Sequence, residues 1–226
     1  MRDPRQAREG RTSTSGEVPA PELDEERQAI LRRDRRLVRR LKQGEERAFR
    51  ELVSTYQDRI FGLTYRMLGD RQEAEDLAQE VFITVYRAIG NYRGEGKFYT
   101  WLYRIASNTC KNRIKYLKGR HHHRRADLDE TPQAHLAAES GGPVVSLQSV
   151  VPSPEAVLEG DRLELAIQRE LTGLEPDHRL LIVLRDIQGL TYQDIMKITG
   201  LAEGTLKSRL HRARLSLRAR LQPLLR

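Results

Sequence analysis

The sequence predicts an all-α protein made of two small helical domains joined by a flexible linker. Apolar residues recur at helical spacing in two blocks, residues 45–118 and 158–226, and no segment alternates like a β-strand. Between them, residues 119–157 lose this periodicity and contain Gly141, Gly142 and Pro143. A chain of 226 residues has room for two small domains and a tether, but not for a large enzyme barrel with extra domains.

Residues 1–44 form an N-terminal extension that we expect to be largely disordered. Its first 24 or so residues are rich in Arg, Ser, Thr, Gly, Pro and Glu and offer almost nothing to bury. Residues 25–42 are a charged helical stretch with a few apolar positions such as Ile30, Leu37 and Leu41. The sequence leaves open whether this stretch docks on the protein or stays solvated.

The first block, residues 45–118, predicts three helices. The first ends at Gly69 and Asp70, which break the apolar pattern. The second has the clearest apolar stripe of the chain, and the glycines of residues 90–96 end it. The third runs from about Phe98 to Lys118.

The second block predicts a helix-turn-helix near its end. Thr191 and Asp194 have the spacing of a helix-capping pair, and they open a short helix. Gly200 suits a tight turn because it tolerates positive φ, and a longer helix begins near Glu203. Before this motif, Pro176 stands in the first turn of another helix, residues 177–187.

Composition indicates an anionic partner and excludes several classes of protein. The 40 Lys and Arg exceed the 32 Asp and Glu, for a net charge of +8. One cysteine, Cys110, excludes an intramolecular disulfide framework or a Cys-rich zinc site. No apolar run is long enough to cross a membrane, and residues 1–17 lack a hydrophobic signal core. We therefore expect no membrane insertion and a cytoplasmic location.

The last predicted helix carries a basic face. Residues 204–226 contain seven Lys or Arg and no acid. Such side chains bind phosphates and base edges when the second helix of a helix-turn-helix enters the major groove of DNA. A solvated helix with cations near its C-terminal dipole is the alternative, but the preceding turn and the absence of acids favour duplex DNA.

The third predicted helix is both basic and aromatic. Residues 97–125 hold nine Lys or Arg without an acid, interleaved with Phe98, Tyr99, Trp101, Tyr103 and Tyr116. Aromatic rings stack on unpaired bases while cations follow the strand, so the pattern favours single-stranded or melted DNA. For Phe98 and Trp101, a role in the hydrophobic core is the alternative.

The helix before it is acidic at its start. Five acids and one Arg fall within residues 70–80. These acids suit the N-terminal helix dipole but would repel DNA. The face therefore meets either solvent or a basic protein partner.

Two motif blocks together resemble one protein family. The runs EAEDLAQEVF (73–82), FYTWLYRIA (98–106) and NTCKN (108–112) are similar to region 2 of bacterial sigma factors. The runs LTYQDI (190–195) and GTLKSRLHRAR (204–214) are similar to region 4. Without a region 3 between them, the chain resembles the extracytoplasmic-function (ECF) group of the sigma-70 family, in its sigma-E-like form.

The resemblance implies a non-enzymatic initiation subunit without cofactor, which binds core RNA polymerase and promoter DNA. It joins the polymerase, is nucleoid-associated when in the holoenzyme, and has an anti-sigma factor as a further partner. The clamp helices of the largest polymerase subunit would bind residues of the acidic helix, namely Asp76, Gln79, Glu80 and Phe82. The flap of the second-largest subunit would bind region 4.

The resemblance also implies two DNA-binding sets. The melted −10 strand would contact Phe98, Tyr99, Trp101, Arg104, Asn108, Lys111, Asn112 and Arg113, with Asn108 and the loop at 94–100 holding an extruded base. The −35 duplex would contact Thr205, Lys207, Ser208, Arg209, His211, Arg212 and Arg214.

Two other functions remain as alternatives. A one-component helix-turn-helix regulator would bind duplex DNA only, and would leave the acidic and aromatic helices without a role. An enzyme is disfavoured because no paired-carboxylate, metal or phosphate-loop constellation is evident. Adjacent His121, His122 and His123 make a poor metal site because neighbouring helical residues point about 100° apart.

Overall fold

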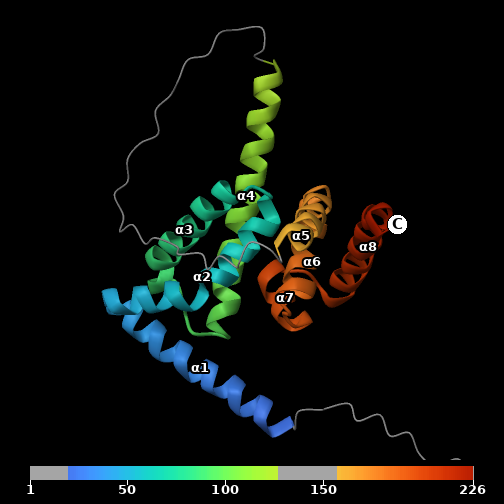
Figure 1. Cartoon of the computed structure of the whole chain (residues 1–226). Helices are drawn as coiled ribbons and strands as arrows, with labels where there is room; N and C mark the ends of the chain where they lie inside the picture. The colour runs from blue at the N-terminus through green and yellow to red at the C-terminus, as the bar shows by residue number, and fades with distance from the viewer. Residues whose placement is uncertain (1–19, 127–156, 226) are drawn as a thin grey trace, which may run out of the picture.

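The computed structural model describes residues 20–126 and 157–225, and every regular element within them is helical. The predicted all-α class is confirmed (Figure 1). The N-terminal body contains α1 (Ala20–Lys42), α2 (Glu46–Leu68), α3 (Arg71–Ala88), the short η1 (Ile89–Asn91) and α4 (Phe98–Ala126). The C-terminal body contains α5 (Val157–Thr172), α6 (Pro176–Ile182), η3 (Val183–Ile187), α7 (Tyr192–Thr199), α8 (Glu203–Leu221) and η4 (Gln222–Leu225).

The break predicted at Gly69 lies between α2 and α3. Gly69 has φ +83° and its N–H donates to Tyr65 O, which ends α2 in a left-handed cap. The side chain of Asp70 then accepts from Glu73 N and caps α3. These two caps let α3 fold back on α2, the most extensive helix pairing in the N-terminal body.

Helix α1 contains the charged helical stretch predicted over residues 25–42, and it begins five residues earlier, at Ala20. Of the extension expected to be largely disordered, residues 20–44 are therefore mostly helical, and residues 1–19 lie outside the described part of the chain. Leu37, Val38 and Leu41 are buried in the core, at 1%, 8% and 2% exposure. These positions form one apolar stripe against α2 and α4, so α1 docks because its partners complete the burial.

Helix α4 is longer than predicted. It continues to Ala126, beyond the boundary expected at 118–119, so the first residues of the predicted linker are helical. The rest of that linker, residues 127–156, lies outside the described residues, as do the side chains of His121, His122 and His123.

The predicted helix-turn-helix is present. Thr191 Oγ1 accepts from Asp194 N at the start of α7, and Gly200 ends α7 with φ +73°. Helix α8 follows from Glu203. Pro176 is the first residue of α6, as predicted, although the helix expected over 177–187 finishes as the π-helical η3.

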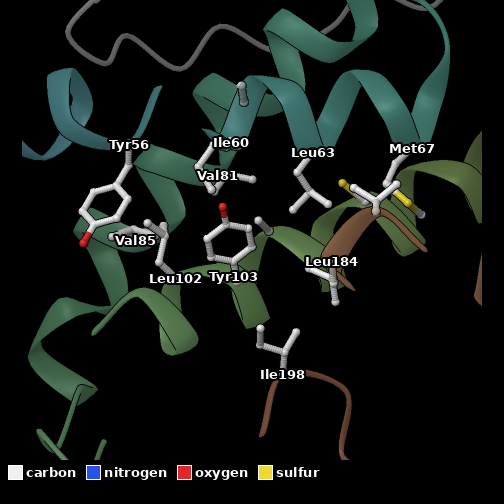
Figure 2. Close-up of a cluster of buried hydrophobic side chains, with 14 of the residues drawn as sticks. Tyr56, Ile60, Leu63, Met67, Val81, Val85, Leu102, Tyr103, Leu184 and Ile198 are labelled. Carbon is white, nitrogen blue, oxygen red and sulfur yellow. The ribbon is translucent and has the colours of Figure 1, made fainter. Parts of the chain in front are cut away.

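The two bodies pack against each other through one continuous core. Helix α7 lies on α4, while α5 and η3 lie on α2. Figure 2 shows Leu184 and Ile198 of the C-terminal body beside Tyr103 of α4. Leu184 also lies beside Met67 of α2. The two predicted blocks therefore correspond to consecutive sets of helices along the chain. Their buried side chains nevertheless form one core that both bodies share.

Candidate nucleic-acid interface

The residues predicted to bind single-stranded DNA divide into buried and exposed groups. Phe98 is 2% exposed and packs against Tyr92, with ring centroids 5.7 Å apart. It is a core residue, as the alternative interpretation held, and its ring has no free face for a base. Trp101 is half-buried, and its ring centroid lies 5.2 Å from that of Tyr92.

A pocket lies beside Trp101. It has a volume of about 440 Å³ and is lined by the loop at 91–97 and by side chains of α4 and α7, among them Thr100, Trp101, Arg104 and Lys197. The expected base-holding loop therefore does frame a pocket next to an aromatic ring. Asn108 is exposed further along α4 and is not among the lining residues, so the structure does not bring Asn108 to this pocket.

The second half of the predicted strand-binding helix is engaged in ion pairs. Lys111 Nζ lies 2.7 Å from Asp177 Oδ1 of α6. Arg113 bonds Glu73 at 2.7 Å and Glu80 at 3.0 Å, both on α3. Burial alone would lower the pKa of Arg113, but its bonds to these two carboxylates raise that pKa. Asn112 is exposed beside them.

The start of α4 carries a cluster that sequence reasoning missed. Tyr99 OH donates to Asp194 Oδ2 at 2.6 Å, and Lys97 Nζ lies 3.3 Å from both oxygens of that carboxylate. Burial alone would raise the pKa of Asp194, but hydrogen bonds from Thr191 and Tyr99 and the charge of Lys97 lower it. The signal available in sequence, a capping acid three residues after Thr191, indicated only a local role.

The acidic helix presents part of its predicted docking set. Asp76, Gln79 and Glu80 are exposed on α3, whereas Phe82 is 3% exposed and belongs to the core. Phe82 therefore cannot contact a partner from this position. Ile83 and Tyr86 are the exposed apolar residues of the same helix, at 36% and 44%, and sequence reasoning did not select them because they fall outside the apolar stripe.

The predicted −35 set lies on one side of α8. Its residues are exposed except for half-buried Arg209, while Leu206, Leu210 and Ala213 bury the opposite side. Within the exposed set, Lys207 Nζ lies 2.6 Å from Glu203, and Arg214 bonds Asp186 at 2.5 Å. The exposed members are Thr205, Lys207, Ser208, His211, Arg212 and Arg214.

Two absences apply to the described part of the chain. Residues 20–126 and 157–225 contain no helix that is both long and apolar enough to span a membrane. In the same ranges, His, Cys, Asp and Glu side chains do not gather into a group able to hold a metal ion. The single cysteine, Cys110, is buried in the core, and this burial raises the pKa of its thiol to about 12.

Comparison with known proteins matches the same two blocks. Residues 52–120 match the family model described as Sigma-70 region 2, and residues 164–217 match Sigma-70 region 4. The RNA polymerase sigma-H factor of Pseudomonas aeruginosa is 42% identical over 193 residues, covering 85% of this chain and 96% of that protein. The ECF RNA polymerase sigma-E factor of Haemophilus influenzae is 38% identical over 194 residues, covering 85% of this chain and 97% of that protein.

The fold is also found in a solved structure. The sigma factor RpoE of Bartonella quintana, in complex with the anti-sigma factor NepR, superposes with a TM-score of 0.53 at 21% identity, over 77% of this chain and 96% of that chain. Together with the two family matches, the relatives confirm the resemblance drawn from the motifs. The chain belongs to the extracytoplasmic-function group of the sigma-70 family and is an RNA polymerase sigma factor.

Proposed function

We propose that this sigma factor divides promoter recognition among three surfaces. Helix α8 reads the −35 duplex with its exposed basic side. The loop at 91–97 and the exposed residues of α4 hold the melted −10 strand. The exposed side of α3, with Asp76, Gln79 and Glu80, docks on the clamp helices of the largest polymerase subunit, and region 4 docks on the flap of the second-largest subunit.

The observation that carries this proposal is the pocket beside Trp101. A duplex-only regulator has no use for the region 2 side of this pocket, where the loop at 91–97 meets the aromatic ring of Trp101 and the cation of Arg104. Extruding a base from a duplex costs about a few kcal/mol. Stacking contributes about 1–3 kcal/mol per base, so one such pocket roughly offsets extrusion and favours a melted strand.

The basic side of α8 supports the −35 assignment. Ser208 and Arg212 stand four residues apart and are both exposed, so they reach the same groove. Arg212 can contact a guanine edge or a phosphate, while Ser208 can donate to or accept from several bases. Lys207 offers a point charge rather than the planar fork of Arg, which suits phosphate better than bidentate base reading.

We also propose that an anti-sigma factor holds this chain when it is inactive. The Bartonella quintana sigma factor of the same fold was solved with its anti-sigma factor NepR. Exposed Ile83 and Tyr86 on α3 lie beside the acids assigned to polymerase, and a partner covering them would block docking. Because the target is RNA polymerase, we place the protein in the cytoplasm.

Run-off transcription with core polymerase tests the function. The full chain plus core enzyme should give discrete transcripts from a subset of genomic fragments, and core enzyme alone should not. A variant with Ser208→Ala and Arg212→Ala should lose transcription from these fragments while still binding core polymerase.

The one-component regulator makes the opposite prediction. It would protect duplex fragments from nuclease without polymerase and would support no transcript. That outcome would overturn the sigma-factor roles proposed for α3 and α4.

A further inference from the structure

The carboxylate of Asp194 is the centre of a polar cluster that joins the two regions. Asp194 belongs to the first turn of α7 and is 2% exposed. It accepts from Tyr99 OH at 2.6 Å and from Thr191 Oγ1 at 2.6 Å. Lys97 Nζ lies 3.3 Å from each of its oxygens, and Thr100 Oγ1 lies 3.5 Å from Oδ1.

The donors from the N-terminal body come from one place. Lys97 precedes α4, and Tyr99 and Thr100 are in its first turn. The N-terminus of a helix carries a partial positive charge, and Lys97 adds a full one. Three side-chain donors and this dipole therefore surround a single carboxylate, an arrangement that would suit a phosphate oxygen equally well.

The packing of α7 on α4 also covers the pocket proposed for the −10 strand. Lys197 of α7 is one of its lining residues, and the carbonyl of Lys197 accepts from Arg104 Nε at 3.0 Å. Nearby, Tyr103 OH donates to Gln188 Oε1 at 2.7 Å, which ties α4 to the end of η3. Region 4 thus occupies the groups that region 2 would offer to a DNA strand.

The closed arrangement also conflicts with the length of a promoter. The −35 and −10 elements are about 25 base pairs apart, or roughly 85 Å at 3.4 Å per base pair. Helix α8 is only about 28 Å long at 1.5 Å per residue, and it packs on α7, which touches α4. Binding both elements therefore requires the regions to separate.

We propose that the packing of α7 on α4 is an autoinhibitory contact, in which Asp194 occupies an anion site that takes a backbone phosphate of the −10 strand once the regions separate. This proposal rests on the proposed function, because it assigns the first turn of α4 to the melted strand. Lys97 and Thr100 become phosphate-binding residues, a role more specific than their place in the loop at 94–100 had indicated. Asp194 becomes an internal competitor of DNA.

The test compares single-strand binding by full-length variants. The probe is a fluorescent oligonucleotide with the non-template −10 strand of a promoter that the wild-type holoenzyme transcribes, and the readout is anisotropy. Asp194→Asn keeps the size of the side chain and an acceptor for Thr191 and Tyr99 but removes the charge. We expect binding about 5- to 150-fold tighter than wild type, the range of typical coupling between sites, and a larger radius of gyration by small-angle X-ray scattering.

Two controls separate competition from a general change in charge. Asp58→Asn removes an exposed carboxylate of α2 and should leave both readouts near wild type. Lys97→Gln should weaken binding, and in the double variant Lys97→Gln/Asp194→Asn the gain from Asp194→Asn should shrink, because both groups act at one site. Replacing one strand phosphate at a time by an uncharged methylphosphonate should abolish the gain at one position.

The proposal is overturned if Asp194→Asn, folded as judged by circular dichroism, binds the strand no more tightly than Asp58→Asn. It is also overturned if the gain survives every methylphosphonate substitution, because no phosphate then takes the place of Asp194. These outcomes are independent of run-off transcription by the wild type. A wild type that transcribes while Asp194→Asn shows no gain refutes the autoinhibitory contact and leaves the proposed function intact.

Discussion

The guanidinium of Arg113 on α4 lies 3.0 Å from the carboxylate of Glu80 on α3. One belongs to the set assigned to the DNA strand and the other to the set assigned to polymerase, and a second bond to Glu73 at 2.7 Å strengthens the link. The cation of Arg113 therefore supports the junction of two functional helices, and any DNA phosphate must compete with two carboxylates for it.

Arg113→Gln should lower the free energy of unfolding by about 0.5 kcal/mol, because partly exposed ion pairs contribute only about 0.2–1 kcal/mol each. Urea denaturation followed by circular dichroism measures this change. Lys115→Gln, an exposed cation two residues further along α4, is the matched control and should be unchanged. Equal stability of the two variants would show that the pairs to α3 contribute nothing.

Asn108 is exposed on α4 away from the pocket beside Trp101. If it contacts the melted strand, Asn108→Ala should slow open-complex formation about tenfold while leaving initial duplex binding near wild type, since a side-chain bond to a base is worth about 1–2 kcal/mol. Permanganate reactivity of unpaired thymines and mobility shifts at low temperature measure the two steps. Equal loss in both steps would remove Asn108 from the −10 set.

Lys207 on α8 forms an ion pair with Glu203, whose carboxylate lies 2.6 Å from Lys207 Nζ. Glu203→Gln should release Lys207 and strengthen binding of −35 duplex by about two- to fivefold at low salt. Lys207→Ala should weaken binding and reduce the slope of log K against log salt by about 0.9, the value for one phosphate contact. A salt titration of anisotropy measures both. An unchanged slope in Lys207→Ala would exclude a phosphate contact by Lys207.

Asp34 is a buried carboxyl between α1 and α2. Burial raises the pKa of Asp34, and the hydrogen bond from Tyr56 OH at 2.9 Å and the nearby Arg33 and Arg59 only partly offset this rise. The folded protein therefore binds this proton more tightly than the unfolded chain, so the contribution of Asp34 to stability falls as pH rises from about 4 through its folded pKa.

Asp34→Asn should remove this dependence. The unfolding free energy of the variant minus that of wild type should increase as pH rises from about 4, because only the wild type has to give up the proton that the folded Asp34 holds. Denaturant titrations at several pH values measure it. A difference that is constant with pH would mean that Asp34 titrates alike in the folded and unfolded protein.

Gly69 and Gly200 both end helices with positive φ, at +83° and +73°, but their surroundings differ. A Cβ at Gly69 would lie 2.6 Å from Thr172 Cγ2 of α5, whereas at Gly200 nothing lies within 4 Å. Gly200→Ala should cost about 1–2 kcal/mol of stability for the backbone alone. Gly69→Ala should cost about 1–3 kcal/mol more because of the overlap between regions.

Adding Thr172→Ser to Gly69→Ala removes the overlapping methyl and should recover most of that extra cost in thermal or urea denaturation. If the two single glycine variants were equally stable, α5 would not be packed against Gly69 in solution.

Several features of this protein follow from short stretches of its sequence. The caps at Asp70 and Thr191, the left-handed glycines at 69 and 200, and the basic side of α8 are formed by residues within a few positions of one another. Their spacing therefore predicted the helices, the helix-turn-helix and the family. Spacing could not separate the buried Phe82 and Phe98 from the half-buried Trp101 or the exposed Ile83 and Tyr86, because exposure depends on which helices pack together.

Sequence by itself determined the order of the helices, their caps and the location of charge. Only the tertiary structure decided that α1 docks and that region 4 closes on region 2. The physical reason is the range of the interactions: Thr191 and Asp194 are three residues apart and cap α7 locally, whereas Tyr99 and Asp194 are separated by 95 residues. Asp194 caps α7 and also contacts region 2, because α7 packs against α4. The local spacing of residues does not predict which distant helices pack together.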